Sequence, residues 1–335
     1  MADAARAAAT RSRRLDNRRR ARHRPDRRRR QGETQPRVER RRHPRRARVA
    51  DRNHGHGGRL RGALRRADRR GTGTGALVSI PTIAITEPTG PPGAPLLVLG
   101  PSLGTSTILW QAVTELMQRS HRVLAWDLPG HGNSPPAGDG FTVGEIALGV
   151  LDAVAALGET HFRYAGVSLG GAVGLEALLA APGRVDAAAI ICSGAKIGST
   201  DGWVDRAAVA RAQGTASLVA SSAERWFAPG SIARQPDAAG RLLHSLRDAD
   251  DESYARCAEA LANYDVRSLL SNITVPVLAM WGEHDSVTPR SNAEEIAEGV
   301  ADGRAVVVAD AGHLAPAEQP AAVASLITDF FEGAA

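Results

Sequence analysis

The stretch His161-Phe-Arg-Tyr-Ala-Gly-Val-Ser-Leu-Gly-Gly171 decides the fold of this chain. It predicts a buried strand over 161–165, a tight turn, and a helix over 171–181. The turn contains Gly166-Val-Ser-Leu-Gly170, a G-x-S-x-G pattern in which the serine occupies the apex. Glycines two residues before and after the apex allow the two backbone segments to approach closely. We therefore predict that Ser168 projects above the sheet in a strained conformation, facing the N-terminus of the following helix.

A G-x-S-x-G match alone also occurs in ordinary glycine-rich turns, so the surrounding pattern must support it. Short apolar runs predict further buried strands at 96–99, 122–125, 187–191, 277–281 and 304–308. Helical patterns lie between or after them at 110–118, 142–157 and 320–331, with Thr142 as an N-cap. Residues 79–86 alternate apolar and polar side chains and predict an antiparallel edge strand. The order predicts an α/β fold with a mostly parallel central sheet flanked by helices.

Residues 196–270 break this alternation. No buried-strand pattern occurs there, but several helical stretches carry scattered Trp and Tyr residues. We predict a helical cap inserted into a core made of residues 76–195 and 271–335. The alternative is a helical bundle packed elsewhere that serves stability only. In an open α/β sheet the ligand site lies beyond the carboxyl ends of the strands, which is where a cap would sit.

Charge separates the first part of the chain from the rest. The first 70 residues hold 27 Arg and 7 acidic residues, a net charge of +20, whereas the whole chain carries only +6. The remaining residues therefore have a net charge of −14. Residues 1–75 are Arg-rich and have almost no apolar periodicity, so we predict a disordered segment.

Three interpretations of this segment are open. It can bind nucleic acid or an anionic surface through its charge; it can be a targeting segment, although no apolar h-region follows the arginines; or it can result from a wrongly placed translation start. We favour a wrongly placed translation start, because Val78 directly precedes the first predicted strand and valine codons can serve as bacterial start codons. N-terminal sequencing of the native protein tests this, and a terminus before about residue 60 would contradict it.

The remaining composition is that of an ordinary reduced protein. No run of 18 or more apolar residues occurs, so no transmembrane helix and no membrane partner are expected. Cys192 and Cys257 have neither metal-site nor redox-motif spacing. We therefore expect two small core cysteines and a cytoplasmic protein.

A serine hydroxyl needs a base to remove its proton and a third group to orient that base. His313 follows the predicted strand 304–308, and Asp285 follows the strand 277–281. The order Ser, Asp, His is the one used by hydrolases with this strand–turn–helix motif. We predict a catalytic triad of Ser168, Asp285 and His313 and no metal site.

Other residues near these two loops compete for the same roles. Glu283 is a second-choice acid, Asp310 is too close to His313 in sequence to reach around its ring, and His284 is expected to face solvent. The backbone N–H groups of Leu103 and Leu169 are the predicted oxyanion donors. The turn-rich loop 127–134 is interpreted as a structural brace for the site.

With these pieces assembled, the sequence from about Val78 onward resembles the α/β-hydrolase superfamily. The shared motifs are Ser102–Gly104, Asp127–Ser134, Gly166–Gly170, Gly282–Asp285 and Gly312–His313. Within the superfamily it looks most like the 3-oxoadipate enol-lactonases. This closer likeness rests on Ser102–Ser106 with Trp110, Ala165–Ala172, Glu224–Gly230 and Tyr254–Leu261. The Arg-rich segment lies outside the family pattern.

The resemblance implies hydrolysis of 3-oxoadipate enol-lactone, a small anionic substrate, in the β-ketoadipate route of aromatic-compound breakdown, without a cofactor. Because the body of the chain is acidic, an anionic substrate calls for a local cation in the cap. Arg225 is the leading candidate, with a solvated helix arginine as the alternative, and Trp203 and Trp226 are further candidate substrate contacts. A general carboxylesterase or a cofactor-free perhydrolase of the same fold is the alternative enzyme. A nucleic-acid-binding protein is expected only if the Arg-rich segment is native, and the oligomeric state stays open.

Overall fold

A six-stranded parallel sheet forms the centre of the protein, whose computed structural model describes residues 79–334. The predicted Arg-rich segment, residues 1–75, lies outside the described residues. The sheet order is β2-β1-β3-β4-β5-β6, and every neighbouring pair is parallel. The strands are β1 (Leu96–Gly100), β2 (Arg122–Ala125), β3 (Phe162–Val167), β4 (Val185–Ile191), β5 (Val277–Gly282) and β6 (Gly303–Val308). The predicted α/β fold with a parallel sheet is confirmed.

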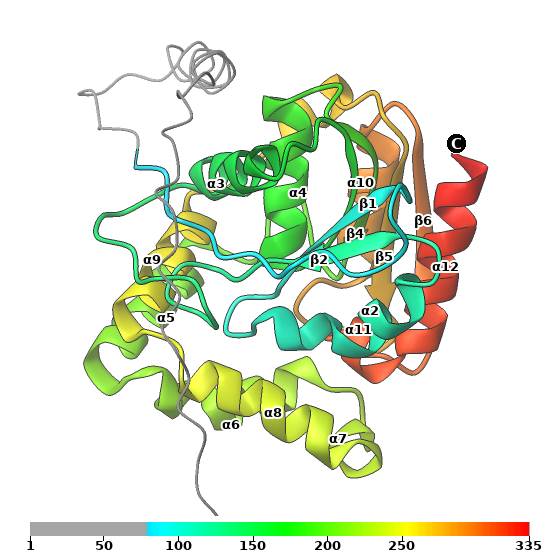
Figure 1. The fold of residues 1–335 in the computed structure, drawn as a ribbon. Helices are drawn as coiled ribbons and strands as arrows, with labels where there is room; N and C mark the ends of the chain where they lie inside the picture. Colours follow the sequence, from blue (N-terminus) through cyan, green and yellow to red (C-terminus); the bar gives the residue numbers. More distant parts are fainter. Residues whose placement is uncertain (1–78, 335) are drawn as a thin grey trace, which may run out of the picture. The chain divides into compact units, whose positions relative to one another are not determined.

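Helices cover both faces of this sheet, as an all-parallel sheet requires. The core helices are η2 (Thr107–Trp110), α2 (Gln111–Met117), α3 (Val143–Ala156), α4 (Leu169–Ala180), α10 (Arg290–Gly299), α11 (Ala315–Glu318) and α12 (Pro320–Gly333). Helix α3 packs against α4, and α2 packs against α12, with the strands between these two pairs (Figure 1). Thr142 caps α3 as predicted, in a reciprocal capping box with Glu145. None of the helices within residues 79–334 is long and apolar enough to cross a membrane.

The predicted antiparallel strand over 79–86 is wrong. The segment makes one isolated antiparallel bridge, from Ile85 to Trp126, and a second follows it from Thr89 to Val123. Proline at positions 81 and 88 removes two of the N–H donors that a regular ladder needs. Side chains take over part of the pairing, since the Thr86 hydroxyl accepts the N–H of Ala125. The segment therefore protects the sheet edge without forming a strand.

All helices between β4 and β5 gather into one group, which we call the cap (residues 196–270). They are α5 (Thr200–Gln213), η3 (Thr215–Leu218), α6 (Val219–Trp226), α7 (Ser231–Arg234), α8 (Pro236–Arg247) and α9 (Asp251–Ala262), and η4 (Arg267–Asn272) leads back to β5. Main-chain hydrogen bonds join the cap to loops after β2 and β6. They run from Asp250 N–H to the Gly130 carbonyl and from His313 N–H to the Trp226 carbonyl. Both loops lie at the carboxyl ends of the strands, so the cap helices contact the edge where ligands bind in such sheets.

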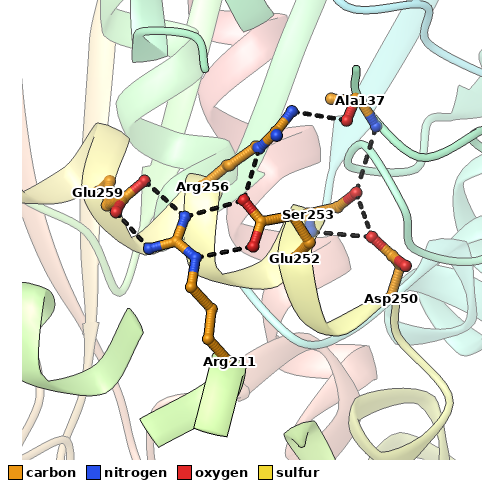
Figure 2. Close-up of polar contacts among 7 residues, drawn as sticks. All are labelled: Ala137, Arg211, Asp250, Glu252, Ser253, Arg256 and Glu259. Atoms are coloured by element: carbon orange, nitrogen blue, oxygen red, sulfur yellow. Dashed lines mark hydrogen bonds and ion pairs between the residues drawn. The ribbon is translucent and has the colours of Figure 1, made fainter. Parts of the chain in front are cut away.

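Ion pairs hold the cap helices together and attach them to the core. Arg211 of α5 pairs with both Glu252 and Glu259 of α9 (Figure 2). Arg256 shares the Glu252 carboxylate and also donates to the Ala137 carbonyl in the loop between β2 and α3. These side chains are partly exposed to solvent, so each pair alone adds little stability. Their effect is to fix α9 relative to α5 and to the loop that precedes α3.

Candidate active site

Ser168 lies at the turn between β3 and α4 with φ 55° and ψ −117°, a backbone region that non-glycine residues rarely occupy. A Cβ atom on Gly166 would collide with the Gly170 carbonyl, so Gly166 is required by the close approach that was predicted. A Cβ atom on Gly170 would instead lie 2.6 Å from the carbonyl oxygens of Gly100 and Pro101, in the loop after β1. The neighbouring strand β4 holds the turn. Ser168 N–H donates to the Ile191 carbonyl (3.0 Å), and the Ser193 hydroxyl donates to the Ser168 carbonyl (2.7 Å). These two hydrogen bonds, from the carboxyl end of β4 and the residues after it, stabilise the strained backbone of Ser168.

Asp285 and His313, which follow β5 and β6, form a buried pair. The His313 Nδ1 and Asp285 Oδ2 atoms are 2.9 Å apart. Asp285 also accepts the Val287 N–H and both the N–H and the hydroxyl of Thr288. Burial alone would raise the pKa of Asp285, but the His313 charge and these hydrogen bonds outweigh it and lower the pKa. An ionised carboxylate only accepts, so the imidazole proton belongs on Nδ1, and Nε2 is left as the acceptor.

The segment after β4 connects this pair to the serine turn. Ser193 bonds to Ser168, as described, and the preceding Cys192 places its sulfur 3.6 Å from the carbonyl oxygen of Gly312, the residue before His313. Ser168, Asp285 and His313 are all buried, with 3%, 6% and 2% of their surface exposed. The structure therefore brings all three predicted residues to one edge of the sheet beneath the cap.

The competing residues lie outside this arrangement. Glu283, His284 and Asp310 are all exposed, and Glu283 accepts the Asp310 N–H, whereas His313 Nδ1 bonds to Asp285. The possible ligand atoms of these three residues lie within 4.8 Å of one another, close enough to share a cation. Exposed acidic groups commonly gather without an ion, and we assign no metal role to them.

Two buried backbone N–H groups are available as oxyanion donors. Leu103 and Leu169 are buried, and no acceptor within residues 79–334 bonds to the N–H of either one. Leu169 is the first residue of α4, where helix geometry leaves the N–H without an intrahelical partner. The Gly170 N–H donates to the Pro101 carbonyl (2.9 Å), which ties the two loops together. Both predicted donors therefore retain free hydrogen-bonding capacity, on two segments that the Gly170–Pro101 bond joins.

The loop 127–134 braces the segment that carries Leu103. Asp127, directly after β2, accepts the Thr107 N–H at 2.7 Å. His131 Nε2 accepts the Gly104 N–H at 3.2 Å. Both braces are buried side chains with 1% exposure. They hold Gly104 and Thr107, residues that follow Leu103, which agrees with the predicted structural role of this loop.

The neutral state of His131 is required for this brace. Its Nδ1 donates to the Pro129 carbonyl (2.9 Å), so Nε2 must stay unprotonated to accept from Gly104. Burial lowers the pKa of His131 to about 4 from its ordinary 6.5. Because the unfolded chain binds the proton first as the pH falls, stability is lost between about pH 6.5 and pH 4, by about 3 kcal/mol.

We expect that loss to be absent in His131→Gln. The difference in unfolding free energy between wild type and variant should therefore shrink by about 3 kcal/mol from pH 7 to pH 4. Urea unfolding of both proteins over this range measures it, and the subtraction removes every other titrating group. A difference that does not change with pH would contradict the assigned state of His131.

The three candidate substrate contacts lie in different surroundings. A Cβ atom on Gly104 would lie 3.3 Å from the Trp226 ring, so this indole packs on the oxyanion segment. Arg225 is exposed at the end of α6. Partial desolvation and the nearby Arg206 lower its pKa, while Tyr254 and Asp285 oppose the shift, so its charge is within electrostatic range of the site. Trp203, in contrast, uses its indole N–H to bind the Ile197 carbonyl at 2.6 Å.

Sequence reasoning missed several residues that support this site. Thr288 donates its hydroxyl to Asp285 and lies three residues after it. Asx-type turns form at this spacing, so the local sequence offered a signal for the contact. Ser193 and Arg206 offered none, because each acts on a residue from another element. Arg206 donates to the Tyr254 and Ser222 hydroxyls, which places a second guanidinium beside Arg225.

Comparison with known proteins agrees with the fold. A family model described as the alpha/beta hydrolase fold matches residues 95–320, and the chain belongs to this family. Among curated proteins, it is 33% identical to 3-oxoadipate enol-lactonase 2 of Acinetobacter baylyi over 229 residues, which cover 68% of this chain and 85% of the relative. It is 32% identical to the pimeloyl-[acyl-carrier protein] methyl ester esterase of Neisseria meningitidis over 218 residues, covering 63% and 83%. Among solved structures, the enol-lactonase of Burkholderia xenovorans LB400 superposes with a TM-score of 0.72 at 30% identity, covering 75% of this chain and 96% of that one.

Proposed function

We propose that the protein hydrolyses 3-oxoadipate enol-lactone, with Ser168 as nucleophile, His313 as general base and acid, and Asp285 as the group that orients His313. The observation that carries the proposal is the buried Asp285–His313 hydrogen bond at the sheet edge where the strained Ser168 turn lies. The similarity to enol-lactonases at 33% identity supports the choice of substrate.

The steps follow from the chemistry of these groups. Ser168 Oγ attacks the lactone carbonyl carbon while His313 Nε2 takes the hydroxyl proton, and the N–H groups of Leu103 and Leu169 stabilise the oxyanion. The ring C–O bond then breaks. The enol oxygen leaves with its electron pair, takes the proton from His313, and tautomerises to the ketone.

Water completes the reaction. His313 removes a proton from the water as it attacks the acyl-enzyme, and returns that proton to Ser168 Oγ when 3-oxoadipate leaves. Asp285 stays ionised throughout and stabilises the imidazolium. Because an enol is a good leaving group, the first step asks little of His313 as an acid.

Two cap arginines support an anionic substrate. Arg206 and Arg225 repel each other, and within residues 79–334 no carboxylate forms an ion pair with either. Two neighbouring guanidinium groups without an acidic partner favour the binding of an anion, such as the carboxylate of the lactone. This supports Arg225, the residue singled out from the sequence, and adds Arg206 to it.

We expect Arg225→Gln to raise KM for the enol-lactone by about 10- to 100-fold, the loss of one charge-assisted hydrogen bond. Turnover of p-nitrophenyl acetate, which has no carboxylate, should change less than about twofold. Steady-state kinetics on both substrates measure the split. Arg234→Gln is the matched control, since Arg234 is a cap arginine whose side chain bonds only to the Pro229 carbonyl within residues 79–334. An equal loss of kcat/KM on the lactone and on p-nitrophenyl acetate would contradict an anion-binding role for Arg225.

A general carboxylesterase is the second candidate, favoured by the 32% identity to a methyl ester esterase. The two candidates differ in kcat/KM. An enol-lactonase prefers the lactone over p-nitrophenyl esters by several orders of magnitude, whereas a general esterase does not. Aromatic-compound catabolism and a cytoplasmic location belong to the same proposal, and the two free, buried cysteines agree with a reducing compartment.

A further inference from the structure

Glu318 is a buried carboxylate that the proposed reaction does not use. It ends α11, and only 4% of its surface is exposed. Its two oxygens are both engaged by backbone N–H groups. Oε1 accepts the N–H of Gly312 at 2.8 Å, and Oε2 accepts the N–H of Ala228 at 2.7 Å. One partner precedes His313, and the other belongs to the cap.

The two partner segments are in direct backbone contact at this point. A Cβ atom on Gly312 would lie 2.7 Å from Ala228 N and 2.8 Å from the Trp226 carbonyl oxygen. That same carbonyl accepts the N–H of His313 at 2.9 Å and of Leu314 at 3.2 Å. The cap segment 226–228 and the loop that carries His313 therefore share one hydrogen-bonded junction, which Glu318 closes.

We propose that Glu318 is a positioning residue that joins the cap to the histidine loop, so that closure of the cap and alignment of His313 occur together. The inference rests on the proposed role of His313 as the base. When residues 226–228 leave the core, the His313 N–H and the Ala228 N–H lose their acceptors at once. Movement of residues 226–228 away from the core therefore leaves the histidine loop without the Trp226 carbonyl, which accepts the N–H groups of His313 and Leu314.

A carboxylate is required at this position because both partners are donors. Glutamine offers one oxygen and one NH2 group, so one of the two N–H groups would face another donor. A buried donor without an acceptor destabilises the arrangement that contains it. Glu318→Gln keeps the volume of the side chain but removes the acceptor of one of the two N–H groups, Gly312 or Ala228.

We expect Glu318→Gln to lower kcat for p-nitrophenyl acetate by about 10- to 100-fold, as small displacements of a catalytic group do. KM should change less than about threefold, and the downfield proton resonance of His313 Nδ1–H should broaden or shift. Gln235→Ala is the matched control. Gln235 also joins the cap to α11, through the Glu318 carbonyl at 2.9 Å, and within residues 79–334 its side chain has no hydrogen bond to the histidine loop. It should leave kcat and the resonance unchanged.

Hydrogen exchange of the wild-type protein tests the same idea without a variant. The amides of Ala228, His313 and Leu314 should exchange with one common opening free energy, because departure of residues 226–228 removes the acceptors of all three. Faster exchange of Ala228 alone would overturn the inference, and so would a Glu318→Gln protein with wild-type kcat and resonance. A wild-type protein inactive on both ester and lactone would instead contradict the proposed function, and the exchange result would still decide the junction.

Discussion

Replacing Ser168 with alanine is expected to lower kcat for the enol-lactone and for p-nitrophenyl acetate by about 10⁴- to 10⁶-fold. The variant keeps the turn, since its two glycines and the bonds from β4 remain, but it has no oxygen to attack the carbonyl. Residual turnover should come from the oxyanion donors and from binding alone. The single-turnover rate with excess enzyme measures the loss without interference from product release.

The control for this variant is Ser325→Ala, which removes an exposed hydroxyl of α12 whose hydrogen bond is to Asp329 of the same helix. Both variants should unfold within a few degrees of wild type. A folded Ser168→Ala protein with wild-type activity would exclude Ser168 as the nucleophile.

Asp285→Asn is expected to lower kcat by about 10³- to 10⁴-fold with little change in KM. Asp285 receives four donors: the backbone N–H groups of Val287 and Thr288, the Thr288 hydroxyl and His313 Nδ1–H. An asparagine NH2 group cannot accept any of them, and opposite His313 it favours the tautomer whose proton is on Nε2. That tautomer cannot remove the Ser168 proton.

Glu283→Gln separates this explanation from a general effect of charge in the same loop. Glu283 is exposed and two residues from Asp285, and it was the second-choice acid from the sequence. Its replacement should change kcat by less than about threefold. If Glu283→Gln lost as much activity as Asp285→Asn, the assignment of the acid to Asp285 would fail.

The serine turn could be predicted because its causes are local. Gly166 is needed for a contact within five residues of chain, and the apolar run before it defines β3, whereas Gly170 is needed because a Cβ there would meet the carbonyls of Gly100 and Pro101 in a distant loop. Thr142 was found for the same reason, since its capping box with Glu145 spans three residues. The edge segment 79–86 was predicted wrongly, because its alternation is that of a strand while proline and the Thr86 hydroxyl replace ladder bonds.

The sequence by itself determined the parallel α/β core, the residues that follow each strand, and the cap as an insertion without strands. These features depend on side-chain periodicity and on turns of a few residues, both of which are written along the chain. Only the tertiary structure decided that Arg206 lies beside Arg225, that His131 holds the Gly104 N–H, and that Glu318 closes the junction between cap and histidine loop. Those contacts join residues 19, 27 and 90 positions apart. A contact across such a separation depends on how the packed elements meet, and it leaves no pattern in the local sequence of either partner.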